Sequence, residues 1–249
     1  MKRVLLVVLG VVVVFVLVFG GIMAATFSGL VPVQPVTDLG GPIGVADGYV
    51  QAFIVPLGDG KAALIDCGND PAAEKLKAKL AELKLEVKAI FLTHGHRDHV
   101  GGCQAFPGAE VYAMAAEKPM IEGEVAAKGP LPRMSKNDPA KSPKVAHALS
   151  DGEVVELGAA KVQGFLVPGH TTGSAAYLAG GVLFLGDAVT GQADGKVRNA
   201  PWIFSDDVEQ CRKSIQSLAT RLEVDKVEVK WLAFAHSGPM PGLAPLAAF

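Results

Sequence analysis

Between positions 93 and 102 the sequence reads THGHRDHVGG, which places three of the chain's six histidines and one aspartate within six residues. Imidazole and carboxylate groups suit zinc and related first-row metals as ligands. His94 and His96 are two residues apart, so they share a face if the segment is extended. Asp98 and His99 follow where the chain turns and can address a second point nearby. The spacing favours two adjacent metal ions, and a histidine cluster without metal fits this concentration of ligands less well.

Three further residues that could bind a metal each follow an apolar run that is predicted to be a strand. They are His170, Asp187 and His236. The first cluster likewise follows an apolar run, residues 88–92. Five of the six histidines thus lie where a strand passes into a turn, a layout that can aim several side chains at one point. His147 is the exception, and we give it no metal role.

These motifs resemble those of the metallo-β-lactamase fold superfamily over about residues 45–240. Besides THGHRDHVGG, four signatures occur in the family's order: LIDCG at 64–68, GHTTGS at 169–174, GD at 186–187, and His236. The resemblance implies an α/β fold, the αββα sandwich, with its site at one edge of two packed sheets. It also implies an enzyme, a metal-dependent hydrolase with a ligand set like that of glyoxalase II.

The resemblance further implies seven metal ligands, all of them histidine or aspartate. One ion would be held by His94, His96 and His170, a second by Asp98, His99 and His236, and Asp187 would bridge the two. Asp98 would also act in catalysis, by orienting a metal-bound hydroxide and passing on its proton. Asp66 would support the site without touching the metals. The implied cofactors are two divalent ions, with zinc preferred over iron or manganese.

The resemblance implies as substrate a small ester, thioester or lactone. β-Lactamases of the superfamily generally lack an aspartate at the place of Asp187, which argues against a β-lactam. Glyoxalase II carries a C-terminal helical domain, and here 13 residues follow His236, so its glutathione thioester is not expected. The alternatives are an iron-dependent sulfur dioxygenase, a β-lactamase, or a non-catalytic binding module on the same fold. The complete ligand set argues against the first and the last.

The N-terminus predicts a membrane segment. Lys2 and Arg3 precede Val4 to Ala25, 22 uncharged residues that would span roughly 33 Å as a helix. We predict an anchor or signal at 1–27, a linker at 28–44 and a metallo-β-lactamase-like domain at 45–249. The two basic residues place the N-terminus in the cytoplasm and the catalytic domain on the periplasmic or extracellular side. Cleavage near Ala24 would make the protein secreted instead.

Composition limits the partners. The net charge of −2 gives no basic excess, so nucleic acid is not an expected partner. We expect a small-molecule substrate and contact with a membrane through the N-terminal helix, and the oligomeric state is left open. The three cysteines, Cys67, Cys103 and Cys211, contain no CxxC pair, which excludes a cysteine zinc knuckle and a disulfide-built scaffold. We interpret each as a small buried hydrophobe rather than a reactive thiol.

The remaining elements are expected to frame the site. Helices are predicted over 70–85 and 206–222, with Asp70 and Asp206 as their caps. Residues 119–143 are irregular and rich in proline, and they would form either a mobile flap or a surface loop. The expected pocket walls are apolar side chains, namely Met120, Met134, Trp202 and Phe204.

Overall fold

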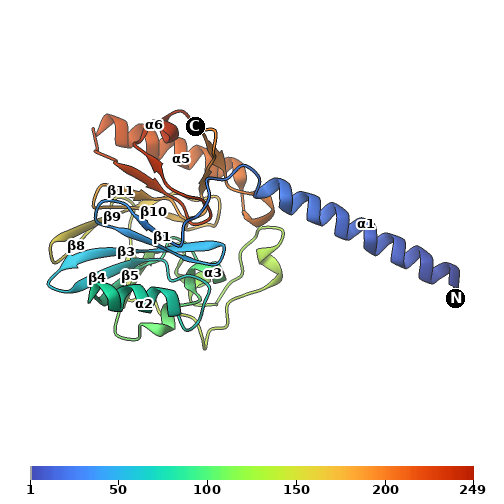
Figure 1. Cartoon of the computed structure of the whole chain (residues 1–249), viewed down its shortest axis with the longest axis horizontal. Helices are drawn as coiled ribbons and strands as arrows, with labels where there is room; N and C mark the ends of the chain where they lie inside the picture. The colour runs from blue at the N-terminus through green and yellow to red at the C-terminus, as the bar shows by residue number, and fades with distance from the viewer. Residues whose placement is uncertain (1) are drawn as a thin grey trace.

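The computed structural model describes residues 2–249 and contains two β-sheets that lie face to face (Figure 1). The first sheet has its strands in chain order, and they are β1 (Val36–Asp38), β2 (Ile43–Asp47), β3 (Val50–Gly58), β4 (Lys61–Ile65), β5 (Glu86–Phe91), β6 (Glu110–Met114) and β7 (His147–Leu149). Neighbours from β1 to β4 pair antiparallel, and those from β4 to β7 pair parallel.

The second sheet comes from the C-terminal half and has the order β15-β14-β11-β10-β9-β8. Its strands are β8 (Val154–Leu157), β9 (Ala160–Leu166), β10 (Ala175–Ala179), β11 (Val182–Phe184), β14 (Trp231–Ala233) and β15 (Met240–Pro241). β11 and β14 pair parallel, so this sheet is also mixed. A separate hairpin, β12 (Val189–Gly191) with β13 (Val197–Asn199), lies between β11 and β14 in the sequence.

Aromatic side chains fill the space between the sheets. The Phe53 and Phe184 ring centroids lie 5.0 Å apart, and those of Phe91 and Tyr177 lie 5.4 Å apart. In each pair one ring comes from the first sheet and the other from the second. Such contacts, at 4.5–7 Å between centroids, add to the burial of apolar area that holds two packed sheets together.

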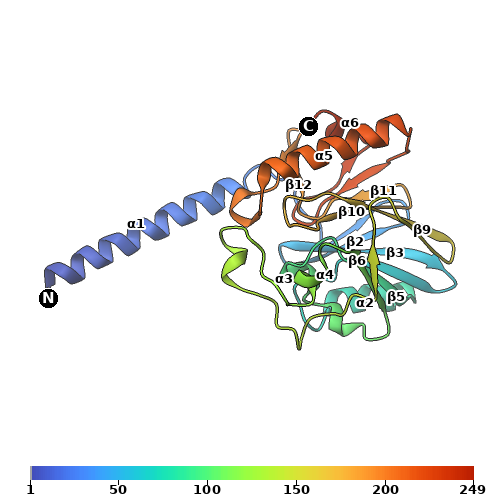
Figure 2. The ribbon, with the colours of Figure 1, turned by 180° about the vertical axis from the view of Figure 1, so that it is seen from behind.

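Helices cover the outer face of each sheet, on opposite sides of the molecule (Figures 1 and 2). α2 (Glu74–Leu83) buries Leu76 and Leu80 against the first sheet, and α5 (Val208–Val224) buries its apolar face against the second. Shorter helices are α3 (Arg97–Val100), α4 (Lys118–Ile121) and α6 (Ala244–Ala247), with 3-10 turns at Cys103–Ala105, Pro132–Met134 and Trp202–Phe204. The predicted αββα sandwich is confirmed.

Both predicted helix starts are displaced along the chain. Asp70 accepts hydrogen bonds from the N–H groups of Ala72 and Glu74, but it does so from a turn before α2 rather than as the helix cap. α5 is capped by Asp207, whose carboxylate accepts from the N–H of Gln210 at 2.9 Å. Asp206 instead accepts from the N–H groups of Lys128 and Gly129, a tertiary contact that the local sequence does not reveal.

All three cysteines are buried as predicted, but the interpretation of Cys67 and Cys103 as simple buried hydrophobes is wrong. Cys67 and Cys103 form a disulfide, with their Cα atoms 5.2 Å apart and a sequence separation of 36. The N–H of Cys67 donates to the carbonyl of His99 at 2.8 Å, so α3 is held beside the chain that follows β4. Only this tertiary return brings the two thiols together. Cys211 is a buried free thiol.

α1 (Lys2–Thr26) projects from the rest of the chain (Figures 1 and 2). Its stretch Leu9–Thr26 has a mean hydropathy of 2.6 and is unburied, so it is long and apolar enough to cross a membrane, a test that a signal sequence also meets. Of the predicted segment 1–27, Met1 lies outside the described residues.

The segment 28–44, predicted as a linker, is packed on the domain. The N–H of Val31 donates to the carbonyl of Gly191 at 3.0 Å, and the N–H of Gly238 donates to the carbonyl of Val31 at 2.8 Å. The segment also supplies β1 and the first residues of β2. Its prolines and glycines therefore shape a route over the domain surface, and the end of α1 is held in place against the domain.

Candidate metal centre

The seven predicted ligands lie together at one edge of the sandwich. Each follows the end of a strand: β5 for the first cluster, β9 for His170, β11 for Asp187 and β14 for His236. His94, His99 and His170 are buried, and the other four are partly buried. Two sheets that pack with their strand ends at the same edge can converge four separate chain segments on one point.

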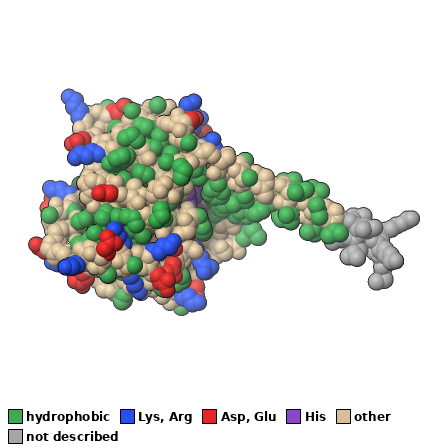
Figure 3. All heavy atoms as spheres, viewed as in Figure 1, with side chains coloured by type: hydrophobic (Ala, Val, Ile, Leu, Met, Phe, Trp, Pro, Cys, Tyr) green, Lys and Arg blue, Asp and Glu red, His purple; other side chains and the backbone are tan. Residues whose placement is uncertain are grey.

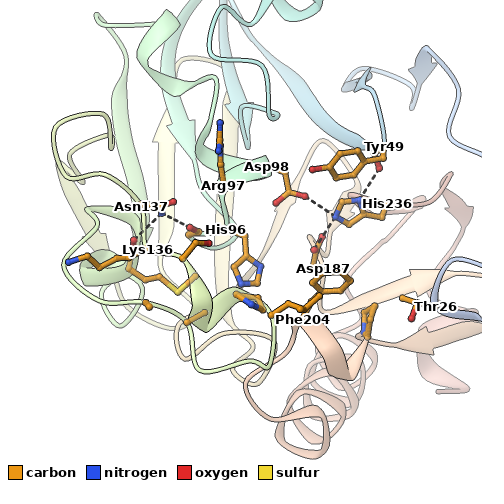
Figure 4. Close-up of a pocket in the computed structure, with 18 of the residues that line it drawn as sticks. Thr26, Tyr49, His96, Arg97, Asp98, Lys136, Asn137, Asp187, Phe204 and His236 are labelled. Carbon is orange, nitrogen blue, oxygen red and sulfur yellow. Dashed lines mark hydrogen bonds and ion pairs between the residues drawn. The ribbon is translucent and has the colours of Figure 1, made fainter. Parts of the chain in front are cut away.

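The ligand atoms form two groups, each with its atoms within 4.8 Å of one another. The first group is His94, His96, His170 and Asp187, and the second is Asp98, His99 and His236. Asp187 also lies against the second group, because its Oδ2 is 3.1 Å from His236 Nε2 (Figure 4). Its Oδ1 is 3.3 Å from His99 Nε2. The arrangement matches the predicted division of the set, whose assignment as metal ligands remains a prediction.

Unpartnered polar atoms indicate that these groups fit cations. His96 Nε2, His99 Nε2 and Asp187 Oδ1 are buried and have no hydrogen-bond partner among residues 2–249. A buried polar atom without a partner costs about 1–3 kcal/mol, and a bound cation would remove that cost. Burial lowers the pKa of His96 to about 4, so its ring is neutral at pH 7, the form that coordinates a metal. These residues therefore fit two metal ions.

Hydrogen bonds fix three of the imidazole rings from behind. His99 Nδ1 lies 2.7 Å from Asp66 Oδ2, His170 Nδ1 lies 3.0 Å from Ser205 Oγ, and His236 Nδ1 lies 2.8 Å from the carbonyl of Tyr49. In each case Nε2 is left to face the site. A partner on the far nitrogen sets the tautomer and the direction of a ligating histidine.

Asp66 braces the start of the ligand loop as well as His99. Its carboxylate accepts from the N–H of Thr93 at 2.8 Å and from the Thr93 hydroxyl at 2.7 Å. Asp66 is buried, and its φ of 59° is a left-handed conformation that aspartate adopts more readily than most residues. The structure thus places Asp66 beside the ligands, where the resemblance expects a supporting residue.

Glu117 is a site residue that the sequence did not reveal. It is buried, and its two oxygens accept from the N–H of Gly95 at 2.8 Å and from the N–H of Gly173 at 2.7 Å. Gly95 lies between His94 and His96, and Gly173 lies in the loop of His170, so one carboxylate joins both ligand loops. Burial raises the pKa of Glu117 to about 7, against the effect of the two N–H donors. Nothing in the surrounding sequence marks this glutamate.

A cavity of about 560 Å³ opens above the two groups (Figure 4). We call the seven ligand residues its floor; His96, Asp98, Asp187 and His236 line the cavity, whereas His94, His99 and His170 do not. Most of the remaining wall comes from three parts of the chain: residues 23–30, residues 120–137 and Phe204. We call these parts the mouth of the cavity. Of the four expected wall residues, Met120 and Phe204 line the cavity, whereas Met134 and Trp202 do not and are largely exposed.

The segment 119–143 is held at two places near the cavity. The Asn137 side-chain amide donates to the carbonyl of Gly95 at 2.7 Å, and the N–H of Leu131 donates to the carbonyl of Ile203 at 3.0 Å. The segment therefore forms a wall of the site. His147, which was given no metal role, lies in β7 with its Nε2 3.1 Å from Glu110 Oε2.

Comparison with known proteins agrees with this geometry. The sequence profile of the Metallo-beta-lactamase superfamily matches residues 45–224. A hydroxyacylglutathione hydrolase of Vibrio cholerae serotype O1 is 28% identical over 181 residues, which is 73% of this chain and 60% of that protein. One from Synechococcus sp. (strain JA-2-3B'a(2-13)) is 32% identical over 175 residues, 68% of this chain and 58% of that protein. The chain thus spans about three fifths of these curated relatives.

Among solved structures, metallo-beta-lactamase SMB-1 bound to 2-mercaptoethanesulfonate superposes with a TM-score of 0.61. The two are 26% identical, and the superposition covers 84% of this chain and 82% of that one. The chain is thus similar in sequence to hydroxyacylglutathione hydrolases and in structure to a metallo-beta-lactamase. The fold alone does not decide between the substrates of these relatives.

Proposed function

The chain belongs to the metallo-beta-lactamase superfamily as a metal-dependent hydrolase, and we propose that it cleaves a small ester, thioester or lactone at a site for two divalent metal ions. The observation that carries the proposal is the gathering of seven histidine and aspartate ligand atoms in two adjacent groups with Asp187 between them. A complete set of this kind favours hydrolysis by two metals over a binding module, which would have no need of it.

Each residue of the floor has a proposed place. His94, His96 and His170 would hold one ion, Asp98, His99 and His236 would hold the other, and Asp187 would serve both. Zinc is the preferred ion, because imidazole and carboxylate ligands suit it. When bound, two such ions polarise a carbonyl oxygen and lower the pKa of water to about 7.

The chain's own side chains position the reacting groups. Asp98 is partly buried at the cavity, with Oδ2 3.4 Å from His236 Nε2, where its carboxylate can orient a water molecule and receive its proton. Tyr49 also lines the cavity, and its ring stacks on His236 at 5.7 Å between centroids. Partial burial and Asp98 raise the pKa of Tyr49, so its hydroxyl stays a hydrogen-bond donor toward a substrate at neutral pH.

The relatives support an acyl substrate. The matched curated proteins carry the name hydroxyacylglutathione hydrolase, which denotes an acylated thiol as their substrate. The structural similarity to a metallo-beta-lactamase adds β-lactams to the candidate substrates. The presence of Asp187 favours an ester, thioester or lactone over a β-lactam.

The location of the domain follows from two features. The disulfide Cys67–Cys103 and the apolar α1 suggest a protein of the secretory pathway with a non-cytoplasmic domain, because disulfides persist in oxidising compartments. We propose that α1 stays as a membrane anchor and that residues 45–249 form the catalytic domain on the periplasmic or extracellular side.

Metal content and turnover test the function together. The full chain is purified without added metal, metals are counted by mass spectrometry, and esters, thioesters, lactones and β-lactams are assayed. We expect near two zinc ions per chain and hydrolysis of at least one acyl class. A single iron ion with oxygen consumption on persulfides would replace the proposal with a sulfur dioxygenase, and no metal after reconstitution would overturn it.

A further inference from the structure

We infer that the mouth of the cavity binds the acyl chain of an amphiphilic ester or thioester that enters from a membrane surface. This rests on the proposed hydrolase function, because the floor must act on the acyl carbonyl. It goes further by naming the group attached to that carbonyl, a hydrocarbon acyl chain. Three observations carry it: the chemistry of the mouth, the placement of the end of α1, and the exposure of the apolar side chains around the opening.

The mouth is mainly apolar, with Thr26, Ser135, Lys136 and Asn137 as polar members, whereas the floor is polar throughout. Its lining includes Phe27, Leu30, Met120, Val125, Leu131 and Phe204. At about 560 Å³ the cavity is within the range of sites that take small molecules, roughly 300–1,000 Å³. A substrate with only polar groups would leave this wall without a partner. A substrate with a hydrocarbon chain next to its carbonyl would cover the wall and reach the floor at the same time.

The segment that leaves α1 is itself part of the site. The Phe27 ring centroid lies 6.5 Å from that of His236 and 6.3 Å from that of Phe204. A backbone hydrogen bond fixes the chain just after Phe27, because the N–H of Ala193 donates to the carbonyl of Gly29 at 2.8 Å. The apolar helix and the metal centre are therefore joined without a slack tether, and a bilayer that holds α1 lies next to the opening of the cavity.

Hydrophobic side chains continue from α1 onto the wall of the cavity, and a histidine is visible in the hollow beside them (Figure 3). Phe27 is 41% exposed and Val125 is 49% exposed, although both line the cavity. An exposed apolar patch that leads into a reactive site is explained by a ligand that covers it. The patch is continuous with the helix, so the ligand can pass from lipid to the floor without crossing water.

Binding of a graded series of probes tests the inference apart from turnover. The full chain is loaded with zinc in lipid nanodiscs and titrated with alkyl thioethers of one head group, a CH₂ replacing the thioester carbonyl. The alkyl chains have two, eight or twelve carbons, and empty nanodiscs correct for partition into lipid. We expect affinity to rise with chain length, by up to about fourfold for each methylene that the cavity buries.

Two valine variants locate the effect. Val125→Asp places a charge in the mouth at a half-exposed position, so it does not disturb the core. Val154→Asp is the matched control, because Val154 is 47% exposed on β8 and does not line the cavity. We expect Val125→Asp to weaken binding of the twelve-carbon probe at least about tenfold and of the two-carbon probe less than about twofold. Val154→Asp should change neither.

Affinity that does not depend on chain length, or an equal loss for both probes in Val125→Asp, would overturn the acyl site. Turnover separates the acyl site from the proposed function. If binding depends on chain length but no matching thioester is hydrolysed, the acyl site stands and the hydrolase function fails. If thioesters are hydrolysed but binding does not depend on chain length, the hydrolase function stands and the acyl site fails. The membrane route requires that the rate on the twelve-carbon thioester follow its mole fraction in the bilayer. A rate that follows its bulk concentration alone would overturn that route.

Discussion

The floor and the mouth of the cavity are built by opposite means. The floor takes its side chains from the ends of strands in both sheets, and its rings are fixed by partners such as Asp66, Ser205 and the carbonyl of Tyr49. The mouth comes from the end of α1, short helical turns and irregular chain, and some of its side chains are about half exposed. Catalysis needs donors held within a fraction of an ångström, and a strand end braced by a core provides that.

The difference indicates that reaction and substrate choice are carried by separable parts. A metal floor works only if all its ligands converge, so changes there should abolish activity. The mouth only has to present apolar surface at the right distance, and loops tolerate such variation. Changes in the mouth should therefore alter which substrate is used while the metal content stays constant. Variants in both parts test that division, beginning with the largest expected effect.

Asp187→Ala should have the largest effect, because it removes the carboxylate that lies against both ligand groups. We expect loss of at least one metal ion per chain. The fall in turnover should exceed the roughly 10–100-fold typical of residues that only orient a ligand. Metal counting and kinetics on the same preparation measure this. Asp225→Ala, at an exposed position at the end of α5, is the control, and normal turnover with full metal content in Asp187→Ala would refute the bridging role.

Asp66→Asn should come next. Asparagine keeps the shape and the left-handed backbone, but it lacks the charge that holds His99 and the Thr93 hydroxyl. Metal affinity should fall roughly 10–100-fold, as for other partners of ligating histidines. Competition with a chelator measures this. Asp47→Asn is the control, since Asp47 accepts from two backbone N–H groups, those of Asn69 and Asp70, away from the ligands. Equal affinity in both variants would contradict the bracing role.

Glu117→Gln tests the joint between the two ligand loops. Glutamine offers one acceptor where glutamate has two, so either Gly95 or Gly173 loses its partner. We expect a loss of about 1–3 kcal/mol in unfolding free energy, together with weaker metal binding. Denaturant titrations with and without zinc separate the two. Glu122→Gln is the matched control, because Glu122 is also buried and accepts from the N–H of Val145 but touches neither loop. If zinc binding weakens equally in the control, Glu117 has no special role.

The disulfide should matter for stability and little for chemistry. Cys67→Ser with Cys103→Ser removes a cross-link that closes a loop of 36 residues, which should cost roughly 3–4 kcal/mol. Thermal unfolding with and without reductant measures this, and reductant should lower the midpoint of the wild type alone. Metal content and turnover at low temperature should stay close to those of the wild type. A large loss of metal would mean that the disulfide holds the floor itself.

Leu131→Ala should have the smallest effect and should act on the mouth alone. Leu131 is half-buried in the cavity wall, so its loss should raise KM for an acyl substrate roughly three- to tenfold while kcat and metal content hold. Met134→Ala is the control in the next turn, since Met134 is 79% exposed and outside the cavity. A loss of metal in Leu131→Ala would show that floor and mouth are not separable.

The fold and the floor could be predicted from the sequence because their information is local. The cluster at His94 to His99 and the later ligands each sit directly after an apolar run, and a strand end fixes where such a side chain emerges. The αββα arrangement, which the family resemblance implied, is confirmed, and its layers bury the apolar faces of the strands and helices. The sequence by itself therefore determined the class of fold and which histidine and aspartate side chains gather at the floor, and their role as metal ligands stays a prediction.

Tertiary structure alone decided the contacts between residues that are far apart in the sequence. Cys67 meets Cys103, Glu117 reaches both Gly95 and Gly173, and the segment 28–44 lies on the domain rather than beside it. The same holds for the mouth, which brings Phe27 beside Phe204 across more than half of the chain. Hydrogen bonds and apolar contacts between distant segments leave no periodicity or local motif, so only the packed sandwich specifies which side chains lie opposite the metal floor.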